Sequence, residues 1–142
     1  MRKFLFGGID HALTVSISLA AFRIFCGLTL VLNHGIHKLP PSQGFEDLVN
    51  QLGFPFPHLF AWLAGLSEFM GGLLLTFGLW TRLSSIFIVI TMFVAATIHH
   101  GSDPYAEAEK AFLFMAIGLL FLVLGSGRFS LDYTFRRKFG MS

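Results

Sequence analysis

The chain has 142 residues, of which 54% are hydrophobic and only 13% are charged, and its mean hydropathy is +0.71. A soluble domain carries about 25% charged residues, so this composition indicates one domain that resides in lipid rather than in water. The net charge is only +2, and no run of Lys and Arg is interleaved with exposed aromatic residues. The composition therefore argues against nucleic acid as a partner and for the lipid bilayer.

Four apolar segments approach the roughly 20 residues that a helix needs to cross a bilayer. Prolines and glycines separate them, which predicts spans over about residues 11–37, 57–80, 83–100 and 105–125. The predicted fold is all-α: an integral membrane four-helix bundle that forms a single domain over residues 1–142, with a basic C-terminal tail at 128–142. Between the second and third spans, Thr81-Arg82 leaves room only for a tight antiparallel turn.

The first loop is the only long connection. Four apolar residues recur in it at helical spacing: Phe45, Leu48, Val49 and Leu52. They predict a short amphipathic helix over Gly44–Leu52, which either lies in the membrane interface or docks its apolar face on the bundle.

Basic residues predict the orientation, because loops on the cytoplasmic side carry an excess of Lys and Arg. Only Lys38 and Lys110 fall on one side of the predicted spans. On the other side are seven: Arg2, Lys3, Arg82, Arg128, Arg136, Arg137 and Lys138. We therefore predict a multi-pass protein of the plasma (inner) membrane with both termini in the cytoplasm and the first loop facing outward.

Two charges, Arg23 and Glu68, lie deep within apolar segments, where an unpaired charge costs several kcal/mol. Arg23 precedes His34 by eleven residues and Glu68 follows His58 by ten, which predicts similar depths of about 15 Å. Small residues stand at the same three offsets from each charge and share its helix face: Ser16, Ala20 and Gly27, and Ala61, Gly65 and Gly72. Because small residues let membrane helices approach closely, both charges should face the bundle interior.

Two interpretations of Arg23 and Glu68 remain open. Either they form an ion pair that fixes the helix register, or they line a polar pocket with catalytic roles. In the pocket, Glu68 would move protons and Arg23 would hold an anionic or quinone oxygen. A partner from another subunit, including a second copy of the chain, is a further alternative.

Five histidines fall at the outer ends of the first three spans: His34, His37, His58, His99 and His100. Glu107 and Glu109 begin the fourth span at the same level. Such a rim can conduct protons, bind metal or haem, or simply be polar at the interface. The spacing favours no ligand set, so we predict no metal site and expect His34, Lys38, His99, His100 and Glu109 to border the pocket.

On the opposite side, Arg82, Arg128 and Asp132 are expected to form a structural salt bridge between the C-terminal segment and the tight turn. The chain has one cysteine, Cys26, and no C-x-x-C, so it cannot exchange disulfides within itself. We interpret Cys26 as a small buried apolar residue.

Several short motifs occur in the order and spacing of a known family, over about Leu19 to Asp132. They are Arg23-Ile-Phe-Cys-Gly27, Gly35-Ile-His-Lys38-Leu39, Gly53-Phe-Pro-Phe-Pro57, Glu68-Phe-Met-Gly-Gly72, Gly78-Leu-Trp-Thr-Arg82, Glu109-Lys-Ala and Gly125-Ser-Gly-Arg-Phe-Ser-Leu-Asp132. In these the chain resembles the DoxX family of small four-span membrane proteins. The resemblance implies quinone or sulfur redox chemistry but assigns no catalytic role to any residue.

Three hypotheses for function follow. The first is a membrane subunit of a redox system that binds a quinone or a small sulfur or thiol compound. The chain carries no flavin, haem or C-x-x-C motif, so electrons would come from other redox subunits and the one expected cofactor is a quinone. The second is a non-enzymatic scaffold for peripheral redox enzymes. The third is a pathway for protons or small solutes.

Overall fold

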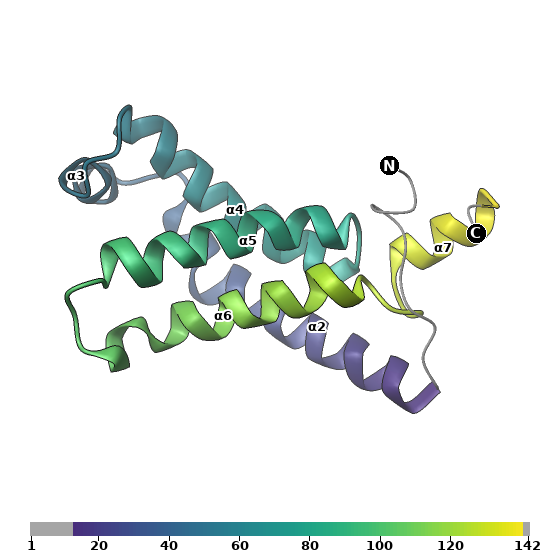
Figure 1. The fold of residues 1–142 in the computed structure, drawn as a ribbon. Coiled ribbons are helices and arrows are strands. Elements are labelled where there is room, and N and C mark those ends of the chain that lie inside the picture. The colour runs from purple at the N-terminus through teal and green to yellow at the C-terminus, as the bar shows by residue number, and fades with distance from the viewer. Residues whose placement is uncertain (1–12, 141–142) are drawn as a thin grey trace.

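The computed structural model describes residues 13–140, in which all regular secondary structure is helical (Figure 1). The long helices are α2 (Leu13–Asn33), α4 (Pro57–Phe77), α5 (Thr81–Val94) and α6 (Tyr105–Leu124). The shorter ones are η1 (Gly35–Lys38), α3 (Gln43–Gln51), η2 (Ala95–His99) and α7 (Leu131–Lys138). The long helices lie within a few residues of the predicted segments. Residues 11 and 12 of the first segment, together with Arg2 and Lys3, lie outside the described residues.

Local sequence explains where α4 ends and α5 begins. Gly78 has a left-handed backbone with φ of 64°, and its N–H and that of Leu79 donate to the carbonyls of Leu75 and Leu74 at 3.1 and 2.9 Å. This pair of bonds closes a helix C-terminus and favours glycine at its left-handed position. The turn is therefore Gly78–Trp80. The predicted turn at Thr81-Arg82 was placed too late, because both residues already belong to α5.

The long helices pack in chain order, α2 on α4, α4 on α5 and α5 on α6. Figure 1 shows α5 and α6 side by side, with α2 crossing them. One end of the molecule carries α3, η1 and the η2–α6 connection, and we call it the loop end. The other carries the α4–α5 turn and α7, and we call it the turn end.

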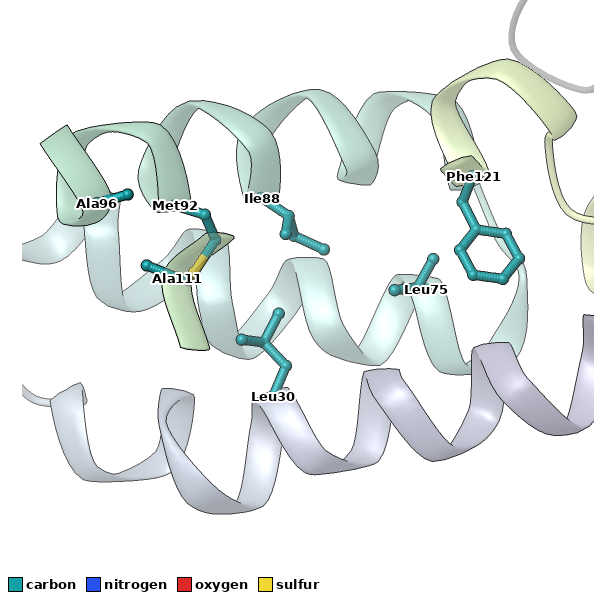
Figure 2. Packing of buried hydrophobic residues seen from close by; sticks show 7 residues of the cluster. All are labelled: Leu30, Leu75, Ile88, Met92, Ala96, Ala111 and Phe121. Carbon is teal, nitrogen blue, oxygen red and sulfur yellow. The ribbon is translucent and has the colours of Figure 1, made fainter. Parts of the chain in front are cut away.

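An apolar core runs between the long helices (Figure 2). Its buried members come from all four of them and from η2: Leu30, Leu75, Ile88, Met92, Ala96, Ala111 and Phe121. Close backbone approach complements this core where α2 meets α4. A Cβ added to Gly27 would lie 2.8 Å from the Gly72 carbonyl oxygen, and one on Gly72 would lie 2.7 Å from a methyl of Val31. Only glycine permits this crossing.

The outer faces of the helices are strongly apolar. Phe25, Phe87 and Val123 expose 69%, 51% and 66% of their surfaces, as expected of residues that face lipid chains. Three segments of the described chain are long and apolar enough to cross a membrane: Leu13–Lys38, Pro57–Phe77 and Thr81–His99. Helix α6 has three charged residues in its first two turns, so its role as a fourth span stays a prediction, as does the interfacial position of α3.

Candidate functional site

Both buried charges face the interior, as the small-residue pattern predicts. Arg23 exposes 1% of its surface and Glu68 exposes none. The six small residues that share their helix faces are buried with them: Ser16, Ala20, Gly27, Ala61, Gly65 and Gly72. The two charges nevertheless lie at opposite ends of the α2–α4 contact and have different partners.

Arg23 binds the C-terminus of α4. Its Nη1 donates to the carbonyl oxygens of Leu75 and Thr76 at 2.5 and 2.6 Å, and its Nη2 donates to that of Phe129 at 2.7 Å. The last carbonyls of a helix lack intrahelical donors and carry the negative end of its dipole. The guanidinium therefore caps α4 and ties it to the segment that leads into α7.

Asp132 performs the complementary task at the start of α5. Its carboxylate oxygens accept the N–H groups of Trp80 and Thr81 at 2.7 and 3.0 Å, and its own N–H donates to the Gly78 carbonyl at 2.9 Å. The first N–H groups of a helix lack intrahelical acceptors, so Asp132 caps α5 from a distant part of the chain. Burial raises the pKa of Asp132, while the two backbone donors and nearby Arg23 act in the opposite direction.

Gly78 lets these groups meet. A Cβ on this residue would lie 2.6 Å from both Arg23 Nη1 and the Ser130 Cβ. We call Arg23, Gly78, Phe129 and Asp132 the turn-end junction. Its polar groups are bonded mainly to backbone, although Arg23 Nε is buried without a partner in the described chain. These bonds hold the end of α4 and the start of α5 together.

The predicted link between the C-terminal segment and the turn is made by Asp132, and the bonds come from backbone N–H groups. Arg82 points elsewhere, and its Nη2 donates to the Val123 carbonyl at 3.1 Å. Arg128 is exposed and lines a surface hollow beside α7. The expected salt bridge among Arg82, Arg128 and Asp132 is thus replaced by helix capping through Asp132.

The Arg23–Glu68 ion pair, one of the two interpretations that the sequence left open, is not formed. A Cβ on Gly35 would lie 2.6 Å from the Phe69 Cα and 3.0 Å from the Glu68 carbonyl carbon, so Glu68 is level with Gly35, twelve residues beyond Arg23. Arg23 is level with Leu75, seven residues or about 10 Å along α4 from Glu68. The prediction assumed that His34 and His58 lie at one depth. Instead, the first turns of α4 extend past the end of α2 and pack on α3.

Lys38 is the partner of Glu68. Its Nζ lies 2.6 Å from Glu68 Oε1, and the side chain of Lys38 is 31% exposed while that of Glu68 is 1% exposed. The short helix η1 turns the chain across α4 and so delivers Lys38 to the site. Gly65 makes this possible, because a Cβ there would lie 2.9 Å from the Lys38 carbonyl oxygen.

The second carboxylate oxygen of Glu68 has no hydrogen-bond partner within the described chain and is buried. A buried polar atom without a partner costs about 1–3 kcal/mol, and more when it is charged. Native structures rarely leave such an atom without a water, an ion or a ligand. Glu68 Oε2 is therefore the most informative atom of the loop end.

The predicted pocket residues divide into two groups. His34 is half-buried, packs edge-on against the ring of Phe114 at 5.6 Å, and lies within electrostatic range of Glu68 and Lys38. His99 lies within electrostatic range of Lys38 as well. It is carried by η2, a π-helical turn of a kind frequent at functional sites. We call Glu68, Lys38, His34 and His99 the loop-end site.

His100 and Glu109 make no bond to Glu68 or Lys38 within the described residues. His100 Nδ1 lies 2.9 Å from Asp103 Oδ2 in the connection to α6, and the rings of His99 and His100 are 4.2 Å apart. Glu109 is exposed on α6. Within residues 13–140, no group of three or more His, Cys, Asp or Glu side chains is placed to hold a metal ion. Cys26 is buried, as interpreted from the sequence.

Helix α3 covers the loop-end site. The ring of Phe45 lies 5.4 Å from Lys38 Nζ, and Glu46 Oε1 lies 2.7 Å from His58 Nδ1 at the start of α4. The sequence indicated Lys38 as a pocket residue but gave no sign of its pairing with Glu68. The available signal was that Lys38 is one of only two basic residues on its side of the predicted spans.

The site thus consists of a buried carboxylate, a partly exposed lysine and two histidines at one end of an apolar helical membrane protein. Comparison with known proteins identifies the class: the DoxX family profile matches residues 18–101. The chain belongs to the DoxX family.

Two relatives support the membrane assignment. An uncharacterized membrane protein of Mycobacterium tuberculosis, Rv3486, is 32% identical over 130 residues, which cover 81% of this chain and 79% of that protein. The inner membrane protein YphA of Escherichia coli is 29% identical over 144 residues, which cover 93% of this chain and 96% of that protein. No solved structure matches the chain.

Proposed function

We propose that this DoxX-family protein is a membrane component of a redox system, and that its loop-end site binds a quinone or a small sulfur-containing substrate. The observation that supports this proposal is the buried Glu68 Oε2, which has no partner within the described chain. An ionised Glu68 can accept a hydrogen bond from a quinol hydroxyl or a thiol, and a protonated one can donate to a quinone carbonyl.

The charges around Glu68 suit such a substrate. Lys38, whose side chain is partly exposed, holds Glu68 Oε1, and its ammonium can also attract a sulfur oxyanion. His34 adds an imidazole, which can both donate and accept a proton. Quinone reduction takes up two electrons and two protons, so Glu68 would relay protons while a partner subunit supplies the electrons.

The basic residues support an orientation in the inner membrane with four spans and both termini in the cytoplasm. In that orientation the loop-end site faces outward. The alternative of a continuous proton pathway receives less support, because Arg23 is bonded to backbone carbonyls of the turn-end junction. A second chain could still complete the site as a homo-oligomer.

The test is quinone retention by the protein purified in a mild detergent. We expect wild type to carry extractable quinone and Glu68→Gln to carry at least about tenfold less quinone per protein. One charge-assisted hydrogen bond contributes about 1.5–3 kcal/mol to binding. Glu109→Gln removes an exposed carboxylate of α6 and is the matched control.

Thiosulfate and a short-chain quinone are then added separately, and protection against thermal unfolding is measured. Stabilisation of wild type and of Glu109→Gln, but not of Glu68→Gln, is the expected result. If wild type binds neither compound and instead co-purifies with soluble enzymes, the scaffold hypothesis replaces this proposal.

A further inference from the structure

A basic hollow lies beside α7 at the turn end, far from Glu68. Its volume is about 520 Å³, and its lining is Arg128, Tyr133, Thr134, Arg137 and Lys138. The Thr134 hydroxyl donates to the Ser130 carbonyl at 3.1 Å. Three cationic side chains and the Tyr133 hydroxyl thus line one concavity, and no carboxylate of the described residues lines it. Such a donor set, without a competing acceptor, matches the oxygens of a phosphate group.

The other side of α7 is apolar, and no part of residues 13–140 covers it. Leu131, Phe135 and Phe139 expose 41%, 38% and 64% of their surfaces, and the rings of Phe135 and Phe139 stack at 6.4 Å. These residues recur every four positions and so share one face of the helix. A short helix with an apolar face and a basic face is typical of an element that lies in the surface of a membrane.

The position of α7 fits this role. Asp132 binds it to the turn between α4 and α5. Helix α4 and the segment Thr81–His99, which comprises α5 and η2, are long and apolar enough to cross a membrane. The turn must lie at a membrane surface, and α7 with it. The helix is also fixed in place, because Ser130 Oγ accepts the Tyr133 N–H at 3.1 Å and Arg23 holds Phe129.

We propose that Arg128 and α7 form a binding site for the phosphate headgroup of an anionic phospholipid. The cations and the Tyr133 hydroxyl of the hollow hold the phosphate, and the exposed Leu131, Phe135 and Phe139 lie among the acyl chains. A soluble anion would use the hollow alone and leave this apolar face in water. A phospholipid satisfies both surfaces at once.

The test is native mass spectrometry of the full-length protein with phosphatidylglycerol and with phosphatidylcholine of the same chain length. Wild type should retain phosphatidylglycerol in preference to phosphatidylcholine. Arg137→Gln should weaken this binding about fivefold, the effect of one basic residue near a membrane surface. Arg136→Gln is the matched control, because it removes the same charge from the neighbouring position. Arg136 lies 5.1 Å from the centroid of the Tyr133 ring but does not itself line the hollow.

Equal weakening by Arg136→Gln and Arg137→Gln would mean that net charge alone attracts the lipid, and it would overturn the site. So would equal retention of the two lipids by wild type. Inorganic phosphate that displaces phosphatidylglycerol at millimolar concentration would point to a soluble anion instead. Near-identical unfolding temperatures of the two variants ensure that lost binding is not lost folding.

Discussion

The two buried charges of this protein are stabilised in different ways. Arg23 has three backbone carbonyls within 2.7 Å, whereas Glu68 has one lysine and one oxygen without a partner in the described chain. Both side chains keep one buried atom without a partner in the described chain, Arg23 Nε and Glu68 Oε2. The guanidinium charge is nevertheless met by three carbonyl acceptors, whereas the carboxylate charge is met by a single lysine. The difference separates a structural residue from a candidate binding residue, although both looked alike in the sequence.

Removal of the Lys38 charge should destabilise the fold more than removal of the Glu68 charge. Lys38→Met leaves a buried carboxylate uncompensated and should lower the free energy of unfolding by about 2–3 kcal/mol, less than a fully buried pair because Lys38 is partly exposed. Glu68→Gln leaves only an exposed lysine and should cost less. The double variant should recover most of the loss, which thermal unfolding in detergent can measure. Additive losses would show that the two side chains do not interact.

Gly78 should tolerate no side chain. Gly78→Ala adds the strain of a left-handed backbone, about 1–2 kcal/mol, and a collision with Arg23 and Ser130. Gly127→Ala is its control, because Gly127 also has a positive φ, of 74°, but no atom within 4 Å of the added Cβ. Unfolding temperatures should fall further for Gly78→Ala, and equal decreases would refute the close packing.

At the scale of elements, the helices were predictable and their partners were not. Apolar length and Pro or Gly boundaries located α2, α4, α5 and α6, because the bilayer demands about 20 apolar residues per span. The displacement of α4 relative to α2 along the helix axes corresponds to no pattern in the sequence. Arg23, and not Lys38, was therefore considered as the ion-pair partner of Glu68. Helix α7 was taken for part of a basic tail, because its anchor Asp132 acts through backbone groups of a turn some 50 residues earlier.

The cap on α5 should contribute measurably to stability. Asp132→Asn replaces one acceptor oxygen by an amide that cannot accept the second N–H of the turn, and should cost about 1–2 kcal/mol. Asp47→Asn changes an exposed residue of α3 in the same way and should cost little. Chemical denaturation of both variants tests the capping role, and an unaffected Asp132→Asn would rule it out.

At the scale of the molecule, polar groups are concentrated at the two ends. The turn end joins α2, α4, α5 and α7 through bonds to backbone groups, while the loop end holds a carboxylate under α3 with one oxygen that has no partner in the described chain. The middle is an apolar core with lipid-facing sides. A binding site in a membrane requires a firmly bonded scaffold, which the turn-end junction supplies, and an atom available to a ligand, which is Glu68 Oε2.

The orientation can be tested with single cysteines in a Cys26→Ala background. Ser102→Cys and Asn50→Cys, both exposed at the loop end, should react with a membrane-impermeant maleimide in intact cells. Thr134→Cys in α7 should react only after permeabilisation. Labelling of all three in intact cells would contradict four spans, and the inverse pattern would reverse the orientation.

The bonds of Arg23 also bear on how the protein is made. Its carbonyl partners in α4 are synthesised 52 and 53 residues later, and the one at Phe129 comes 106 residues later. During translation the first helix must therefore enter the translocon with an unneutralised guanidinium, which disfavours its early release into lipid. Chains truncated before Phe129 should remain vulnerable to quality-control proteases, because α2 is stable in the membrane only after the segment around Phe129 has bound Arg23.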